Sequence, residues 1–193
     1  IRAPRWTQDH EPAPPEGPAR FVGARPCNAT LARGDCGAMS IPAAIQAFVD
    51  AQCDAAPARY DDLRAVIFNG TLKRSPEESQ TDGLVAIPRG VLERVGVRVD
   101  EVRTADHVIP PGVWPAMREH AYDADDFPGI YRELVPPADI ILLAGPIWLG
   151  DQSSMTRLIV ERLYGYSGEL NDRGQWSYYG KVGGVVITGN EDG

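Results

Sequence analysis

The strongest constraint on the fold comes from three short, mostly apolar runs at 63–68, 139–144 and 182–187. Continuous apolar runs of this length are typical of strands that are buried on both faces of a parallel sheet. A fourth stretch, 97–102, alternates between apolar and charged residues and reads as a further strand. Helical sequence separates these runs, so they predict an open α/β fold whose ligands bind beyond the carboxyl ends of the strands.

Apolar periodicity predicts helices over 41–53, 84–95, 127–134 and 154–163. Pro88 lies inside the second helix, so we expect either a kink there or a regular helix that begins only near Pro88. Gly96 is typical of a helix end, and Ser153 or Ser154 is placed to cap the last helix. The connection over 104–127 is long and irregular, which is typical of functional lids and of flexible loops.

The chain of 193 residues is long enough for one domain and an extension. Residues 1–38 are rich in Pro, Ala and Arg without periodicity, so we expect them to be disordered or to be an upstream extension. We expect a short helix and linker over 39–62. The α/β domain is then expected over 63–193, and we expect it to be incomplete at its C-terminus because the chain stops at a loop after a strand.

Composition limits the kinds of partner and compartment that we expect for the protein. The formal net charge is −8, from 19 basic and 27 acidic residues, which disfavours nucleic acid and an anionic membrane surface. No apolar run reaches the roughly 18 residues of a membrane span. Cys27, Cys36 and Cys53 are odd in number and widely spaced, so we interpret them as free thiols of a cytoplasmic protein.

The loop after the first strand, 69–81, is the principal candidate site. It carries hydroxyls at Thr71, Ser75, Ser79 and Thr81 and cations at Lys73 and Arg74, and it ends where a helix can start. The first N–H groups of a helix lack internal partners and carry partial positive charge, so they bind phosphate. Neither a Walker A sequence nor a G-x-G-x-x-G fingerprint occurs, which favours a terminal phosphate monoester as the ligand. An ordinary solvated turn is the alternative reading.

Two more loops follow strands, at 145–150 and 188–193, and both are rich in small or polar residues. Because the strands are predicted to be parallel, all three loops are expected to meet at one edge of the sheet. Acidic residues near the first loop, Glu77, Glu78 and Asp82, partly cancel its cations. Backbone N–H groups would then carry much of the phosphate binding.

Together the three loops resemble those of the flavodoxin-like NAD(P)H-dependent FMN reductase family. The Ser79-Gln80-Thr81 element resembles the family's phosphate loop, and Pro146-Ile147-Trp148, with the helix through Arg157, Glu161 and Arg162, resembles its second flavin loop. The stretch 188–193 resembles the loop that lines the flavin ring. The resemblance covers roughly 63–193.

The resemblance implies a flavodoxin-like three-layer sandwich with a parallel sheet in the order 2-1-3-4. The family's fifth strand and final helices do not follow Gly193, so it also implies a domain truncated at its C-terminus with an exposed edge at the fourth strand. Trp148 would stack on the flavin or cover the sheet edge as a core residue. No catalytic acid or base and no metal is implied. The residues implied to bind FMN are Asn69, Thr71, Leu72, Lys73, Ser79, Gln80, Thr81, Pro146, Ile147, Trp148, Leu149, Gly150, Thr188, Gly189, Asn190, Glu191 and Asp192.

The function implied is that of an FMN-dependent oxidoreductase. NAD(P)H would reduce bound FMN, which would pass electrons to a quinone, a flavin or another small-molecule acceptor. A homodimer or higher oligomer is expected, and the aromatic loop over 164–180 is either a dimer surface or a local cover for the sheet. Two alternatives stay open: a flavodoxin-type electron carrier that does not oxidise NAD(P)H, and a phosphate-binding α/β module without flavin.

Overall fold

The computed structural model describes residues 43–55 and 58–189. The chain divides into two units after Gly34, and every described residue belongs to the second, Asp35–Gly193. The interpretation of 1–38 as disordered or upstream sequence lies outside the described residues, as do residues 190–193 of the third loop.

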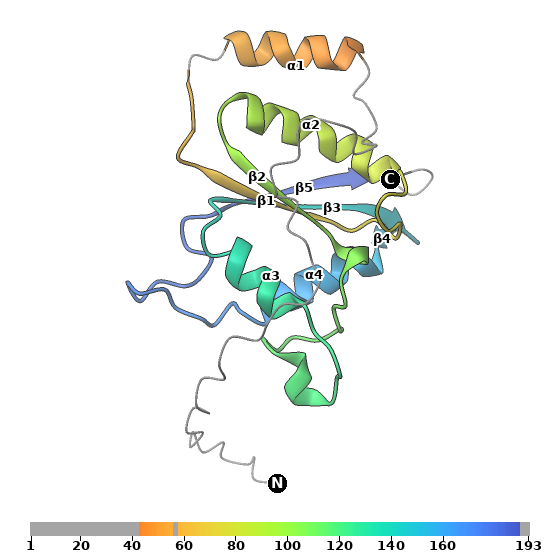
Figure 1. Ribbon diagram of the computed structural model, residues 1–193, viewed down its shortest axis with the longest axis vertical. Coiled ribbons are helices and arrows are strands. Elements are labelled where there is room, and N and C mark those ends of the chain that lie inside the picture. Colours follow the sequence, from red (N-terminus) through yellow and green to blue (C-terminus); the bar gives the residue numbers. More distant parts are fainter. Residues whose placement is uncertain (1–42, 56–57, 190–193) are drawn as a thin grey trace. The chain divides into compact units, whose positions relative to one another are not determined.

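A parallel sheet forms the centre of the second unit (Figure 1). Its strands are β1 (Arg64–Asn69), β2 (Arg98–Arg103), β3 (Ile140–Trp148) and β5 (Val182–Thr188), and the short β4 (Asp151–Gln152) pairs with the end of β3. The parallel strands lie in the order β2-β1-β3-β5. Since β5 is the fourth strand expected from the sequence, the predicted order 2-1-3-4 is confirmed, and the fold is flavodoxin-like α/β.

Helices cover both faces of this sheet (Figure 1). The helices are α1 (Ala43–Ala55), α2 (Gln80–Arg94), α3 (Phe127–Leu134) and α4 (Ser154–Tyr164), with short 3-10 turns η1 (Thr104–Asp106) and η2 (Met117–His120). The α2 helix lies on one face, and α3 and α4 lie on the other. The α1 helix lies over α2, where Arg94 pairs with Asp54 at 2.5 Å. All four helices expected from the sequence are therefore present.

The α2 helix begins at Gln80, well before Pro88, where one of the two expectations placed its start. Ser79 is its N-cap: its hydroxyl accepts from the Asp82 N–H, and the Asp82 carboxylate accepts from the Ser79 N–H. This capping box starts the helix eight residues before Pro88 and continues it through that proline. The expectation of a helix beginning only near Pro88 is wrong, whereas Gly96, with φ of +99°, ends the helix as expected.

The third strand is longer than predicted, because we expected it to stop at Ala144 and the turn to occupy 145–150. In the structure β3 continues to Trp148 and folds back onto β4, with Ile147 opposite Gln152 and Trp148 opposite Asp151. The turn consists of Leu149 and Gly150 alone, with φ of +54° and +75°. Two consecutive residues with positive φ are typical of the tightest hairpin turns.

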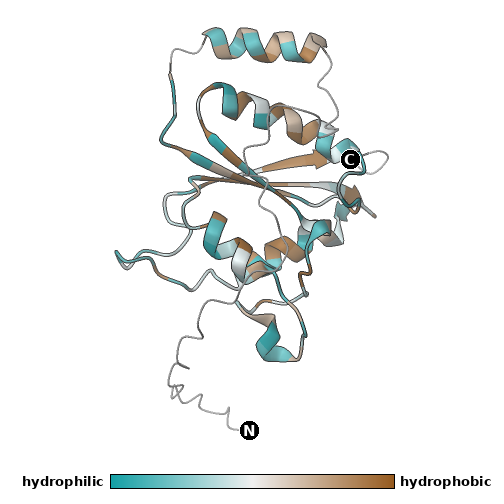
Figure 2. Cartoon of the chain, in the orientation of Figure 1, coloured by the Kyte–Doolittle hydropathy of each residue, from teal (hydrophilic) through white to brown (hydrophobic). Residues whose placement is uncertain are grey.

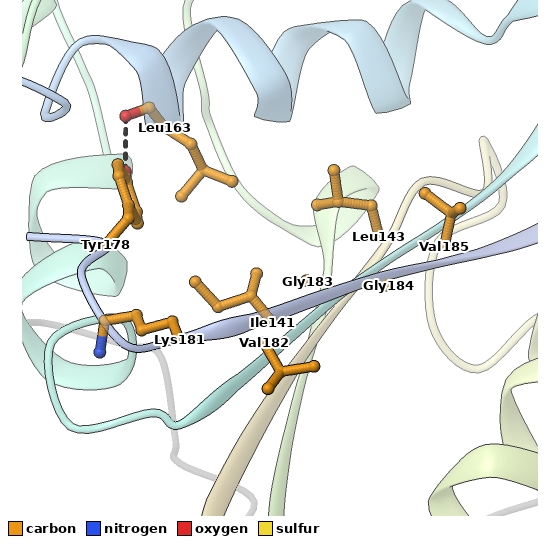
Figure 3. Close-up of a pocket in the computed structure, with 9 residues that line it drawn as sticks. All are labelled: Ile141, Leu143, Leu163, Tyr178, Lys181, Val182, Gly183, Gly184 and Val185. Atoms are coloured by element: carbon orange, nitrogen blue, oxygen red, sulfur yellow. Dashed lines mark hydrogen bonds between the residues drawn. The ribbon is translucent and has the colours of Figure 1, made fainter.

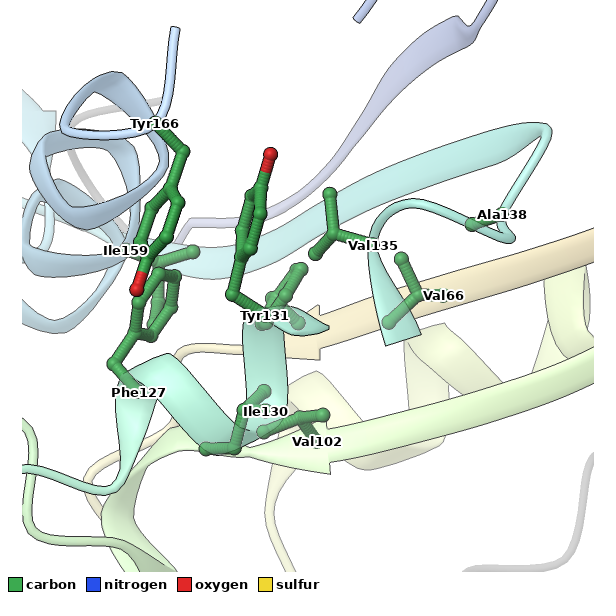
Figure 4. Close-up of a cluster of buried hydrophobic side chains, with 10 residues drawn as sticks. Val66, Val102, Phe127, Ile130, Tyr131, Val135, Ala138, Ile159 and Tyr166 are labelled. Carbon is green, nitrogen blue, oxygen red and sulfur yellow. The ribbon is translucent and has the colours of Figure 1, made fainter. Parts of the chain in front are cut away.

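The core has two parts, one on each side of β1, whose residues after Arg64 are all buried. On the α3 and α4 side, Val66 and Phe68 belong to one cluster with Phe127. In this cluster Tyr131 stacks on Tyr166 with ring centroids 3.6 Å apart (Figure 4). On the α2 side, Ile67, Val85 and Ala144 form a smaller cluster. Figure 2 shows a corresponding pattern, in which β5 is hydrophobic, β2 alternates between hydrophilic and hydrophobic residues, and the helices also carry hydrophilic residues.

A buried ion pair ties the long connection before α3 to α4. The Arg162 guanidinium lies 2.6 Å from the Asp125 carboxylate, and both side chains are 0% exposed. Arg162 also donates to the carbonyls of Trp114 at 2.7 Å and Pro115 at 2.9 Å. Although Arg162 lies on the helix that resembles the second flavin loop, its guanidinium is committed to this connection.

Candidate functional site

The three candidate loops meet at one edge of the sheet. Asn69 at the end of β1 lies opposite Ala144 of β3, and Pro146 of β3 lies opposite Thr188 at the end of β5. The Thr81 and Thr188 hydroxyls are 3.2 Å apart, which joins the first loop directly to the start of the third. The expected convergence of the loops is therefore present, and it is set by the register of the parallel strands.

Asn69 supports the first loop from beneath. Its side chain is fully buried, and its amide nitrogen donates to Asp82 at 2.7 Å and to Glu101 at 3.0 Å. Its amide oxygen accepts from the Thr71 N–H at 3.1 Å. With both ends of the amide engaged, Asn69 fixes the course of the chain as it leaves β1.

The hydroxyls of the first loop lie around the N-terminus of α2. Thr71, Ser79 and Thr81 are buried, and each is already an acceptor or a partner of another group. A hydroxyl that accepts a hydrogen bond retains its own proton to donate. The N–H groups of Gln80 and Thr81 belong to the first helical turn, where backbone donors have no intrahelical partner. These groups together form a donor-rich surface.

The charged residues of the first loop are paired with one another. Lys73 lies 3.2 Å from the Glu77 carboxylate and donates to the Glu78 carbonyl at 2.8 Å. The Asp82 carboxylate bonds to the Arg103 guanidinium beneath the loop, where the two side chains are largely buried. The acidic residues that the sequence places near the candidate site therefore have cationic partners, apart from the exposed Glu78 side chain, for which no ion pair is found among the described residues.

Sequence reasoning missed two residues that hold this loop. Arg103, the last residue of β2, donates to the Glu77 carbonyl at 2.8 Å and contacts the Lys73 carbonyl at 3.4 Å. Asp106 accepts from the Ser75 N–H at 2.9 Å and from its hydroxyl at 2.6 Å. The signal was present, since the carboxyl end of a strand adjacent to β1 must lie beside the loop that follows β1.

The second loop is packed tightly against the N-terminus of α4. A Cβ atom on Gly145 would lie 1.9 Å from the Thr156 hydroxyl oxygen, and one on Gly70 would lie 2.7 Å from the same atom. Ser153 caps α4 by accepting from the Thr156 N–H, and its own N–H donates to the Pro146 carbonyl at 2.9 Å. The missing side chains at both glycines therefore allow the helix to approach the strand ends.

The apolar side chains of the β3–β4 hairpin, which forms the second loop, differ in how exposed they are. Pro146, Ile147 and Trp148 are half-buried, whereas Leu149 at the tip is 98% exposed. In the third loop Thr188 is half-buried and Gly189 is exposed. The remaining predicted site residues, Asn190, Glu191 and Asp192, lie outside the described residues.

A hollow of about 460 Å³ lies elsewhere on the sheet (Figure 3). It is bounded by the first residues of β5, by Ile141 and Leu143 of β3, and by Leu163 and Tyr178, whose hydroxyl donates to the Leu163 carbonyl at 2.6 Å. Its walls are mostly apolar, and they begin at the amino ends of the strands. It is therefore separate from the edge where the loops meet.

In the described part of the chain, no cluster of three or more His, Cys, Asp or Glu side chains is placed to hold a metal ion. None of the helices over 43–55 and 58–189 is both long enough and apolar enough to cross a membrane.

Comparison with known proteins gives two similar sequences. Over 139 residues the chain is 53% identical to a protein of Mycobacterium bovis named divalent metal cation transporter MntH. This match covers 72% of this chain and 20% of that protein. Over 137 residues the chain is 38% identical to 8-demethyl-8-aminoriboflavin-5'-phosphate synthase of Streptomyces davaonensis. This match covers 68% of this chain and 52% of that protein. No known family profile matches the chain.

A solved structure is also similar. It is the crystal structure of RosB with the bound intermediate 8-demethyl-8-formylriboflavin-5'-phosphate, with a TM-score of 0.59 and 37% sequence identity. The match covers 68% of this chain and 54% of that chain. The protein is thus homologous to RosB in its flavodoxin-like part and spans about half the length of that relative. Neither named relative is an NAD(P)H-dependent FMN reductase, so the family suggested by the sequence is supported only as far as a flavin-related flavodoxin-like protein.

Proposed function

We propose that the protein is an FMN-dependent oxidoreductase, in which NAD(P)H reduces bound FMN and the FMN passes electrons to a quinone, a flavin or another small-molecule acceptor. The observation that carries this proposal is the meeting of a donor-rich helix N-terminus with an apolar hairpin at one sheet edge. A riboflavin 5'-phosphate needs both, because its phosphate requires N–H and O–H donors and its ring requires an apolar border. The similarity to RosB, whose bound intermediate is a riboflavin 5'-phosphate derivative, supports this ligand class.

The residues of the first loop fit a phosphate monoester. Ser79, Gln80 and Thr81 bring the first-turn donors of α2, and Thr71 adds a buried hydroxyl. The Asp82 carboxylate, which would oppose a phosphate, is paired with Arg103. In this proposal Asn69 supports the loop through its three hydrogen bonds, and Leu72 and Lys73 form the exposed rim.

The residues of the second and third loops would hold the rest of the flavin. Pro146, Ile147 and Trp148 supply half-buried apolar surface at the strand end, and Leu149 and Gly150 extend it to the hairpin tip. Residues 188–192 would border the ring from β5. When bound, the flavin itself supplies hydride and electron transfer, while the protein supplies position and electrostatics.

A second candidate is favoured by one finding, the 38% identity to an enzyme named for making an aminoriboflavin phosphate. In that case the flavin would be the substrate whose ring is altered, and the same loops would bind it. The two candidates differ in the fate of the flavin: a cofactor is recovered unchanged after many turnovers, whereas a substrate leaves with a different mass.

The deciding experiment adds FMN to the purified protein and follows three signals: flavin binding by fluorescence, NAD(P)H consumption by absorbance, and flavin mass by mass spectrometry. We expect binding, with NAD(P)H consumed in the presence of a quinone and FMN recovered intact. A changed flavin mass would select the second candidate. Binding with neither change would favour an electron carrier, and the absence of binding would reject all three flavin roles.

A matched pair of variants localises the binding. Thr81→Val keeps the shape of a buried side chain but removes its hydroxyl, so we expect FMN affinity to fall by on the order of tenfold. Ser177→Ala removes a hydroxyl that bonds the Glu169 carbonyl away from the loops and should leave affinity unchanged. Equal effects of the two variants would contradict the placement of the phosphate.

A homodimer is a separate proposal, which size-exclusion chromatography with light scattering tests directly.

A further inference from the structure

Arg103 connects β2 to the first loop from outside the candidate site. Its guanidinium forks, with one nitrogen reaching the Glu77 and Lys73 carbonyls and the other bonding the Asp82 carboxylate. The side chain is 15% exposed and its bond to Asp82 is partly buried, whereas its bonds to the two carbonyls lie at exposed residues. One residue of a neighbouring strand therefore fixes both ends of the segment 73–77.

Asp106 provides a second attachment from the same side. Its two carboxylate oxygens accept from the Ser75 N–H and from the Ser75 hydroxyl, at 2.9 and 2.6 Å. Ser75 is at the middle of the segment whose ends Arg103 holds. Three points along one loop are thus bonded to residues at and just after the end of β2.

The charge of Arg103 matters as much as its contacts. Asp82 is the third residue of α2, so its carboxylate lies beside the donors that would receive a phosphate. An uncompensated carboxylate in that position repels a dianion, whereas a paired one does not. Because Asn69 is a neutral partner of Asp82, Arg103 is the cation that compensates it among the described residues.

We propose that Arg103 and Asp106 are positioning residues that set the preference of this site for a phosphorylated flavin over the dephosphorylated one. The inference rests on the proposed flavin site and extends it to two residues that are not among those predicted to bind the flavin. Arg103 acts by neutralising Asp82 and by holding the Glu77 carbonyl, and Asp106 acts by holding Ser75.

The test measures the affinities of the full chain for FMN and for riboflavin by fluorescence titration, and takes their ratio. Arg103→Gln should lower the FMN-to-riboflavin ratio by on the order of tenfold, because it leaves one carboxylate unpaired beside the phosphate. Arg103→Lys keeps the charge and should retain most of the ratio. Asp106→Asn should lower it by roughly threefold, because an amide oxygen can replace only one of the two acceptors.

Arg98→Gln is the matched control. Arg98 lies on the same strand and is exposed, and among the described residues its side chain pairs only with Asp100, at 3.7 Å. Its replacement should therefore not change the FMN-to-riboflavin ratio. A fall of both affinities by the same factor in Arg103→Gln would overturn the proposal, because a purely structural residue behaves in that way. If Arg103→Gln does not fold, Arg103→Lys and Asp106→Asn decide the question by the same ratio. Failure of the unaltered protein to bind either flavin would instead reject the flavin site itself.

Discussion

The buried pair of Arg162 and Asp125 permits a sharp test of how the long connection is held. Replacing Arg162 with Met removes the guanidinium and leaves the Asp125 carboxylate buried without its cation. Breaking a buried pair in this way costs about 3–5 kcal/mol. Domains are stable by only about 5–15 kcal/mol, so one substitution would remove a large share of the stability.

The structure places the expected cost within that range. Arg162→Met loses hydrogen bonds to two backbone carbonyls as well as to the carboxylate. Two features limit the loss: the Arg162 Nε has no partner among the described residues, and Asp125 keeps the N–H groups of Met117 and Phe127. We therefore expect a decrease of about 4 kcal/mol in the free energy of unfolding. Asp125→Asn should lower the free energy of unfolding by less than Arg162→Met does. The double variant Arg162→Met/Asp125→Asn should lower it by less than the sum of the two single changes.

Urea unfolding followed by circular dichroism measures these changes. Arg157→Met is the matched control, because Arg157 lies on the same helix and pairs with Glu161 at 3.1 Å, but with side-chain exposures of 60% and 34%. An exposed pair of this kind contributes at most about 0.5 kcal/mol. If Arg162→Met costs less than about 1 kcal/mol, or no more than the control, the pair does not anchor the connection.

Three further predictions concern other parts of the fold. Gly145→Ala should destabilise the protein by about 1–3 kcal/mol in urea unfolding, because its Cβ would lie 1.9 Å from the Thr156 hydroxyl oxygen, and Thr156→Ala should recover most of that loss. Burial raises the pKa of Tyr166 to about 12 from an ordinary value of 10.0, so stability should fall as pH rises between these values, and Tyr166→Phe should flatten that slope in pH-dependent unfolding. Val185, 67% exposed on β5, should promote association, so Val185→Lys should lower concentration-dependent light scattering; equal scattering would contradict this role of the strand.

The exposed side of β5 was itself expected from the sequence. Among the described residues β5 pairs with β3 only, and Val182, Val185 and Ile187 are exposed. The strands were predictable because apolar runs between helices have few other solutions in an α/β protein. The order of the strands then followed from the resemblance, and the convergence of the loops followed from their parallel direction.

Features that depend on distant partners were not predictable. The Gly145-Pro146 pair reads as a strand break, yet β3 passes through it because β5 pairs with these two residues and β4 pairs with the two that follow. Arg162 lies four residues after Leu158 and three after Ile159, on the apolar face of α4, but its charge is typical of a surface residue, and only the connection folded beneath α4 accounts for its burial. Both outcomes depend on tertiary contacts that no local pattern of residue types records.

The acidic residues of the first loop illustrate the same limit in a way that bears on function. In sequence, Glu77 and Asp82 look like an obstacle to phosphate binding. In the structure Glu77 pairs with Lys73, and Asp82 holds the start of α2 while Arg103 compensates its charge. What remains for a ligand is a set of N–H and O–H donors. Their contribution to phosphate binding depends more on the direction of their hydrogen bonds than on the net charge of the loop. Recognition at such a site is therefore governed by whatever holds the loop in place, and the residues that do so lie on the neighbouring strand and outside the motif.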